Sequence, residues 1–326
     1  MRLRRMRALH ENEVKNVKTI QNDTEKDVLS IAGYSDACEA APAGLVPAEQ
    51  IAKEDARELA GAGVLLDGGR SGTMVVRDHQ PVCVEADSQA FEMLPLATAL
   101  ERYPEVREKY FFKAVPPDYD EVVRRCAAQE TPLGFYIRVK AGKKVTLPCQ
   151  VAMLMASENI AQIVHNIVIL EDDSQLELVT GCLTRHSVNR GLHLAVGENY
   201  VGRNAKLVST MVHSWGPEVT TYPRNGTVVA ENGRFESNYV SLRPAKQVVS
   251  DPQTYLNGKG ATAKYLTIVL SAPGSHISTQ GTVHLNAEDT GAELMHRGVC
   301  TGGEMRQGGL LIGKARCKAH VDCAGM

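Results

Sequence analysis

Short apolar strands separated by tight turns dominate the chain from residue 134 onward. The segment GFYIRVKAGKKVTLPCQVAMLM, residues 134–155, alternates between apolar and polar positions, turns at Gly142 and resumes as a strand. Beyond it, Val, Ile, Leu and Thr form further strands of about five to eight residues, and helical periodicity fades. This pattern predicts a mainly β core over residues 131–326.

A repeating unit organises this β-rich part. It consists of an apolar strand, a turn of Asp, Asn, Gly or Ser, and a second alternating strand, first seen in HNIVILEDDSQLELVTGC at 165–182. Equivalent turns recur at 202–205, 232–233, 258–261, 289–292 and 313–314. Units of roughly 22 to 31 residues bury their apolar faces by stacking on one another, as in a β-helix. A sandwich or jelly roll also joins strands by turns, but the equivalent places of these turns favour a parallel β-helix.

The first 130 residues have a different composition. Residues 1–30 are polar and charged and predict a terminal arm. Residues 31–130 predict a small mixed α/β domain. Its expected elements are a helix over 47–63, a hairpin over 71–86 and a second helix over 95–112 that is split near Pro104.

Charge and hydropathy narrow the class of protein. The chain carries 36 basic and 38 acidic residues, a balance that argues against nucleic-acid binding and gives no support to membrane attraction. No run of about 18 apolar residues predicts a transmembrane helix. The basic start MRLRRMR is followed by polar sequence rather than a signal peptide. We therefore expect a cytoplasmic protein whose partners are proteins or small inorganic species.

The eight cysteines lie singly, without a CxxC pair, and in a chain lacking a signal peptide they are expected to be reduced thiols. They are Cys38, Cys83, Cys126, Cys149, Cys182, Cys300, Cys317 and Cys323. The string GKGATAK at 258–264 lacks the residue order of a phosphate-binding loop, so this chain is not expected to bind a nucleotide.

Several strings, taken in order, resemble one known family. They are GFYIRV, VHNIVILEDDSQLELVTGC, MVHSW, PRNGTVV, GAELMHRGV and GGLLIGKARCKAHVDC. Together they resemble the SufB/SufD family, the core proteins of the SUF iron–sulfur cluster assembly machinery, and most closely its small archaeal and anaerobic members. The resemblance runs over residues 65–326 and rests on the collinear series.

This resemblance implies a right-handed parallel β-helix that forms a homodimer or a SufB/SufD-like heterodimer near its C-terminal end. It also implies a scaffold rather than an enzyme, with no catalytic residue. The expected partners are a SufC-type ABC ATPase, a sulfur donor protein and apo iron–sulfur proteins that receive a transient iron–sulfur cluster. Family members usually continue beyond the string HVDCAGM into ATPase-docking helices, so the sequence is expected to be a C-terminally truncated member.

Cys323 is the first candidate for holding the cluster. Thiolate sulfur is the usual protein ligand of iron–sulfur clusters and can also carry persulfide sulfur, and the resemblance implies that Cys323 matches the essential cysteine of the family. His320 is a second candidate ligand. On a strand, His320 and Asp322 share one face while Cys323 points to the other, so these residues can meet at one ion only through a bend or a second subunit. The reading of His320 as a surface or packing residue stays open.

The resemblance also implies a sulfur-transfer group. Cys182 matches a family cysteine regarded as the entry point for sulfur, His193 matches a histidine along a route inside the helix, and Thr210 lies at a neighbouring family position. Cys300 and His296 are possible additional ligands near the expected interface. For each of these residues a packing role is the alternative.

Two other functions remain open at this stage. A β-helix that binds or cleaves polysaccharide needs paired carboxylates and commonly aromatic platforms, whereas aromatic residues make up 5% of this chain and Trp215 is its single tryptophan. A SufD-like structural partner would support assembly without the principal cysteine. The presence of both Cys182 and Cys323 favours the SufB-like role.

Overall fold

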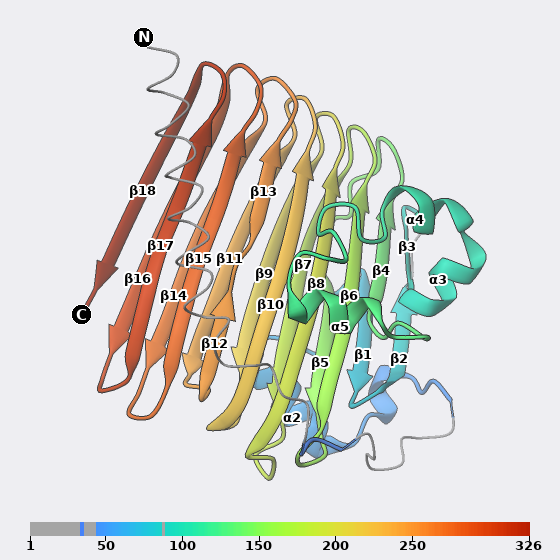
Figure 1. The fold of residues 1–326 in the computed structure, drawn as a ribbon. Helices are drawn as coiled ribbons and strands as arrows, with labels where there is room; N and C mark the ends of the chain where they lie inside the picture. The colour runs from blue at the N-terminus through green and yellow to red at the C-terminus, as the bar shows by residue number, and fades with distance from the viewer. Residues whose placement is uncertain (1–32, 36–43, 87–88) are drawn as a thin grey trace. The chain divides into compact units, whose positions relative to one another are not determined.

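Parallel pairing between successive coils of the chain builds two facing sheets (Figure 1). The structure, a computed structural model, describes residues 33–35, 44–86 and 89–326. The arm expected at 1–30 lies outside these residues. Residues 34–326 form one compact unit.

Each sheet has nine strands, and all pairs are parallel except β1–β2 and β3–β4. The first sheet has the order β18-β16-β14-β11-β9-β7-β5-β1-β2. Its strands are β1 (Gly72–Arg77), β2 (Gln80–Ala86), β5 (Cys149–Met155), β7 (Gln175–Thr184), β9 (Lys206–Ser214), β11 (Arg234–Arg243), β14 (Thr262–Ser271), β16 (Thr290–Cys300) and β18 (Cys317–Gly325).

The second sheet has the order β12-β15-β13-β10-β8-β6-β4-β3, and β17 pairs with β15. Its strands are β3 (Phe91–Pro95), β4 (Phe135–Val139), β6 (Ala161–Leu170), β8 (Arg190–Val201), β10 (Glu218–Val229), β12 (Gln247–Ser250), β13 (Gln253–Leu256), β15 (His276–Leu285) and β17 (Glu304–Gly313). The chain passes from one sheet to the other and back in about seven coils. The expected parallel β-helix is confirmed, because strands of a sandwich or jelly roll would pair antiparallel.

The expected N-terminal elements are present, and they extend the coils. Helices η1 (Ala48–Gln50) and α2 (Lys53–Gly61) occupy the helix predicted over 47–63, and β1 and β2 form the predicted hairpin. Helices α3 (Leu96–Arg102) and α4 (Pro104–Lys109) are the two parts of the split helix. Strand β1 pairs with β5, and β3 pairs with β4, so strands from residues 72–95 continue both sheets.

Helix α5 (Glu121–Ala127) was not expected. Its N-cap is Asp120, whose Oδ1 accepts a hydrogen bond from the backbone N–H of Val123 at 2.9 Å. Val122, Val123 and Cys126 are its buried residues. The sequence signal for this helix is Asp120, a favourable N-cap residue followed by the apolar residues Val122 and Val123.

The helices cover the outer faces of the first coils. Leu59 of α2 packs in one cluster with Leu154 and Leu183 of the first sheet. Leu96 and Val106, from α3 and α4, pack with residues of the second sheet that include Ile167. No helix among the described residues is long and apolar enough to cross a membrane.

A buried carboxylate ties the segment after α4 to the second sheet. Glu198 on β8 is fully buried and accepts hydrogen bonds from the backbone N–H groups of residues 112–115 at 2.6–3.2 Å. Its Oε2 also lies 2.7 Å from Nε2 of His165, which stacks on Phe111. These contacts give hydrogen-bond partners to a polar side chain whose burial without them would be costly.

A turn residue with left-handed backbone marks each of five successive coils. These residues are Asp173, Asn204, Asn232, Gly260 and Asp289, with φ between 54° and 70°. Asn, Asp and Gly adopt this conformation at the lowest cost. The N–H of each one donates to a carbonyl of the next coil at 2.7–3.0 Å, so the turns stack in register.

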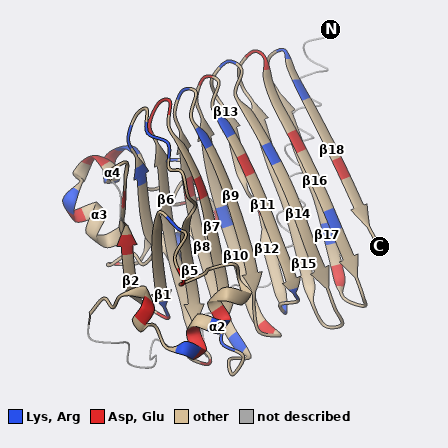
Figure 2. Ribbon diagram, turned by 180° about the vertical axis from the view of Figure 1, so that it is seen from behind, with Lys and Arg blue, Asp and Glu red and all other residues tan. Residues whose placement is uncertain are grey.

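The carbonyls that accept these bonds belong to residues of alternating charge. In coil order these residues are Arg203, Glu231, Lys259, Glu288 and Arg316, and Asp172 precedes them. Arg203 pairs with Asp172 at 2.7 Å, and Arg316 pairs with the turn residue Asp289 at 2.6 Å. Figure 2 shows the basic and acidic residues along the coils. Exposed pairs of this kind add little to stability, because water and salt screen the attraction between the two charges.

Replacement of Asn232 by valine is expected to destabilise the chain, because a β-branched residue is strained at a φ of 54°. We expect the free energy of unfolding to fall by about 1–2 kcal/mol, the usual cost of the left-handed conformation. Denaturant titration measures this loss. The control Asn232→Gly accepts the same φ and is expected to unfold near the wild-type midpoint. An equal loss in both variants would contradict the argument from backbone conformation.

Candidate functional site

One row of inward-facing side chains on the first sheet ends at Cys323. Register places one member of the row on each of six neighbouring strands. The row, called here the inner row, consists of Thr180, Met211, Tyr239, Thr267, His296 and Cys323. Neighbouring strands are about 4.8 Å apart, so the five steps from β7 to β18 span about 24 Å.

Cys182 lies on the same inward face of β7, two residues beyond Thr180. Its side chain belongs to the interior core, and burial raises the pKa of its thiol to about 12. Cys182 is therefore a protonated thiol at neutral pH, and it has to become accessible before it can act as a nucleophile. Its register partner on β9 is His213.

His213 and its neighbours form a buried aromatic cluster beside Cys182. Nδ1 of His213 lies 2.8 Å from the hydroxyl of Tyr239, and the rings of His213 and His193 lie 5.4 and 5.0 Å from the ring of Trp215. Nδ1 of His193 lies 3.0 Å from Oε1 of Gln162. Burial lowers the pKa of each imidazole to about 3, and for His213 the nearby His193 adds to the shift. Both imidazoles are therefore neutral hydrogen-bonding groups.

The structure does not bring Thr210 into this interior group. Residues of β9 alternate between faces, and Leu207 and His213 face inward, so Thr210 faces outward. Its Oγ1 accepts a hydrogen bond from Nδ2 of Asn238 on the neighbouring strand at 3.2 Å. Met211 occupies the adjacent inward position.

An open pocket of about 350 Å³ lies at the C-terminal end of the coils. Cys300 and Cys323 both line it and are both exposed. Met305 and Gln307 of β17 line it as well, and the Nε2 atom of Gln307 is among the buried polar atoms without a hydrogen-bond partner. A Cβ added to Gly298 would lie 2.3 Å from both of these side chains, so this glycine leaves room for them.

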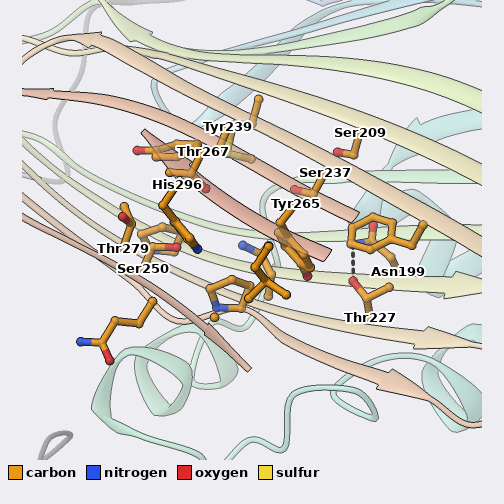
Figure 3. A pocket seen from close by; sticks show the side chains of 18 residues that line it. Asn199, Ser209, Thr227, Ser237, Tyr239, Ser250, Tyr265, Thr267, Thr279 and His296 are labelled. Atoms are coloured by element: carbon orange, nitrogen blue, oxygen red, sulfur yellow. Dashed lines mark hydrogen bonds between the residues drawn. The ribbon is translucent and has the colours of Figure 1, made fainter. Parts of the chain in front are cut away.

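His296 lies behind this pocket rather than in it. It is the register partner of Cys323, yet its side chain is buried and lines an internal cavity (Figure 3). Burial and the neighbouring Arg297 lower the pKa of His296. Of the two possible additional ligands, Cys300 therefore shares a pocket with Cys323, whereas His296 adjoins Cys323 from the inside.

His320 faces away from Cys323, as alternation along the strand predicts. Its register partner is Glu293 on the outer face of β16. Asp322 also faces outward, where its Oδ2 accepts a hydrogen bond from Nη2 of Arg297 at 2.6 Å. Within residues 33–35, 44–86 and 89–326, no group of three or more His, Cys, Asp or Glu residues could hold a metal ion.

The other described cysteines have different surroundings. Cys83, Cys126 and Cys149 are buried, and burial raises the pKa of each thiol to about 12. Cys317 is half-buried. Cys38 lies outside the described residues.

Acid is expected to destabilise the chain through His193 and His213. Below pH 6.5, the ordinary pKa of histidine, the unfolded chain binds more protons than the folded chain, whose imidazoles have pKa values of about 3. Stability therefore falls as the pH is lowered toward 3, by up to about 1.4 kcal/mol per pH unit for each group. Denaturant midpoints at neutral and mildly acidic pH measure this fall. The double variant His193→Gln and His213→Gln is expected to lose less stability in acid, and an unchanged pH dependence would contradict the assignment.

Comparison with known proteins identifies the family. The profile of the family described as SUF system FeS cluster assembly, SufBD core domain, matches residues 153–315. Cys182, His193 and His296 lie within the match, whereas His320 and Cys323 lie beyond it.

Full-length relatives cover more of the chain. An iron–sulfur cluster assembly SufBD family protein of Archaeoglobus fulgidus is 34% identical over 274 residues, which are 83% of this chain and 73% of the relative. A Methanothermobacter thermautotrophicus member is 31% identical over 262 residues, 79% of this chain and 64% of the relative. The iron–sulfur cluster assembly protein SufB of Bacillus subtilis is 24% identical over 212 residues, 65% of this chain and 43% of that protein. The chain thus spans less than two thirds of the length of some relatives, and it belongs to the SufBD family of iron–sulfur cluster assembly proteins.

Proposed function

We propose that this chain is a scaffold subunit that accepts sulfur at Cys182 and holds a nascent iron–sulfur cluster, as cargo, at Cys323. One observation carries the proposal: Cys182 and Cys323 both face the interior side of the same sheet. The other members of the inner row and the aromatic side chains around His213 lie between them. The cytoplasmic location expected from the sequence belongs to this proposal.

Sulfur acceptance requires Cys182 to be exposed and deprotonated. In the transfer, the Cys182 thiolate attacks the outer sulfur of a donor persulfide, a new S–S bond forms on Cys182, and the donor leaves as a thiolate, with no net oxidation. The buried thiol has a pKa of about 12, so opening of the neighbouring coils precedes this step. His213, the register partner of Cys182, is the nearest imidazole in the adjoining strand able to take the thiol proton once water enters.

Cluster assembly takes place at the open pocket. Cys323 and Cys300 supply thiolate ligands, the preferred donors for iron–sulfur clusters. A pocket of about 350 Å³ has room for a cluster rather than a single ion. The end strand β18 also leaves Val321 exposed, and a second copy or a SufD-like subunit docked here would complete the ligand set.

Membership of the SufBD family supports the remaining partners of this proposal. We propose a SufC-type ATPase that moves the paired subunits, a persulfide-bearing sulfur donor, and apo iron–sulfur proteins as recipients. The presence of both Cys182 and Cys323 supports the SufB-like role. His193 is a candidate for positioning the buried aromatic side chains around His213. The side chains of Thr210 and His320 face outward, so these two residues have no role in the proposed steps.

Two cysteine variants separate sulfur entry from cluster holding. The chain is loaded anaerobically with ferrous iron and either dissolved sulfide or a persulfide-bearing donor protein, and visible absorption records the cluster. Cys323→Ala is expected to lose cluster by about tenfold or more with both sulfur sources, because a ligand is gone. Cys182→Ala is expected to fail only with the donor protein.

The control is Cys83→Ala, which removes a buried thiol far from the inner row and is expected to behave as the wild type. Normal loading of Cys323→Ala from both sources would show that this thiol does not hold the cluster. Normal transfer from the donor to Cys182→Ala would remove Cys182 from the route.

A further inference from the structure

The open pocket that contains Cys300 and Cys323 is poor in side-chain hydrogen-bond donors. Among the described residues that line it, none is Lys, Arg or His, and Gln307 alone carries a side-chain N–H group. The two thiols give up their protons when they bind iron. A negatively charged occupant of this pocket can therefore receive a side-chain N–H hydrogen bond from Gln307 and from no other lining residue.

The amide of Gln307 is not engaged elsewhere in the protein. Its Nε2 atom is buried without a hydrogen-bond partner, and its Oε1 atom lies against Gly298, which also lines the pocket. A half-turn about the last side-chain bond exchanges the nitrogen and the oxygen of an amide. Because no hydrogen bond among the described residues fixes this amide, the half-turn breaks none, and it brings the N–H donor to the pocket.

Gly298 brings the amide close to Cys323. A Cβ added to Gly298 would lie 2.3 Å from Oε1 of Gln307, so the amide rests directly on the backbone of the glycine. The register partner of Gly298 is Gly325, which is the next inward position after Cys323, roughly 7 Å further along the strand. The thiol and the amide thus line one pocket, and neither glycine places a side chain between them.

An iron–sulfur cluster has negatively charged sulfides that accept hydrogen bonds. Such bonds stabilise the reduced form, which is the more negative one, and so they raise the reduction potential. Resting on the proposed function, we propose that Nε2 of Gln307 donates a hydrogen bond to a sulfide of the nascent cluster held at Cys323. Gln307 thus binds the cluster without being a ligand of iron, and it makes the cluster easier to reduce and slower to leave the pocket.

The reduction potentials of loaded variants test this hydrogen bond. The full chain is loaded anaerobically with ferrous iron and dissolved sulfide, and the cluster is titrated with dithionite while visible absorption is recorded. Gln307→Met keeps the length of the side chain but has no N–H group. We expect this variant to load near the wild-type level, to have a more negative reduction potential, and to lose its cluster to an iron chelator severalfold faster.

Two charged variants separate hydrogen bonding from packing. Gln307→Glu has nearly the same shape and places a negative charge at the sulfide, so we expect a potential more negative than that of Gln307→Met. Gln307→Lys restores an N–H donor and is expected to have a potential at or above the wild-type value. The control Gln80→Met, at an exposed position of β2 at the other end of the first sheet, is expected to leave the potential unchanged.

An unchanged potential in Gln307→Met, or an equal shift in Gln80→Met, would overturn the inference. If Gln307→Met folds poorly, equal potentials in Gln307→Glu and Gln307→Lys would overturn it instead. Cys323→Ala is loaded in parallel. Loss of the cluster from Cys323→Ala together with wild-type potentials in every Gln307 variant would overturn this inference alone, whereas full loading of Cys323→Ala would overturn the proposed function.

Discussion

A backbone hydrogen bond between the turn residues of neighbouring coils sets the geometry on which the site depends. The N–H of Asn204 donates to the carbonyl of Glu231, and that of Asn232 donates to the carbonyl of Lys259, each at 2.9 Å. Because side chains in a strand alternate faces, a slip of one residue would turn every inward group outward. The stacked turns therefore decide that His296 and Cys323 share one inward row.

Several buried polar side chains interrupt the apolar interior of the coils. Trp215, Thr221 and Ser241 each bury a polar atom without a hydrogen-bond partner among the described residues, and such atoms cost about 1–3 kcal/mol each when nothing satisfies them. The first coils are apolar inside and are covered by α2, α3 and α4 on their outer faces. The apolar core continues through the later coils, where Val269, Val283 and Leu285 are buried. Apolar and polar positions therefore share one continuous interior.

Much of the fold could be predicted from the sequence, because turn residues and strand alternation are local signals. The same signals could have placed the inner row. Left-handed turn residues at 173, 204, 232, 260 and 289 are spaced 31, 28, 28 and 29 residues apart, and the same steps lead from Thr180 to Met211, Tyr239, Thr267 and His296. This count would have selected Met211 over Thr210 and would have found His213, which lies 31 residues after Cys182.

Other features of the site depend on contacts across the interior and carry no local signal. Met305 and Gln307 share the open pocket with Cys323 because β17 faces the end of β16, which no spacing within one sheet reveals. Alternation did predict that His320 and Cys323 face opposite ways, because only the local strand decides that.

The alternating charges beside the turns also bear on how such a chain can change length in evolution. Arg203, Glu231, Lys259 and Glu288 come in strict succession, each on its own coil. Duplication or loss of a single coil would bring two like charges side by side at the new junction between coils. Gain or loss of two coils would preserve the alternation of basic and acidic residues. Homologues with more or fewer coils through this region are therefore expected to differ by an even number of coils, or to carry a neutral residue at the junction.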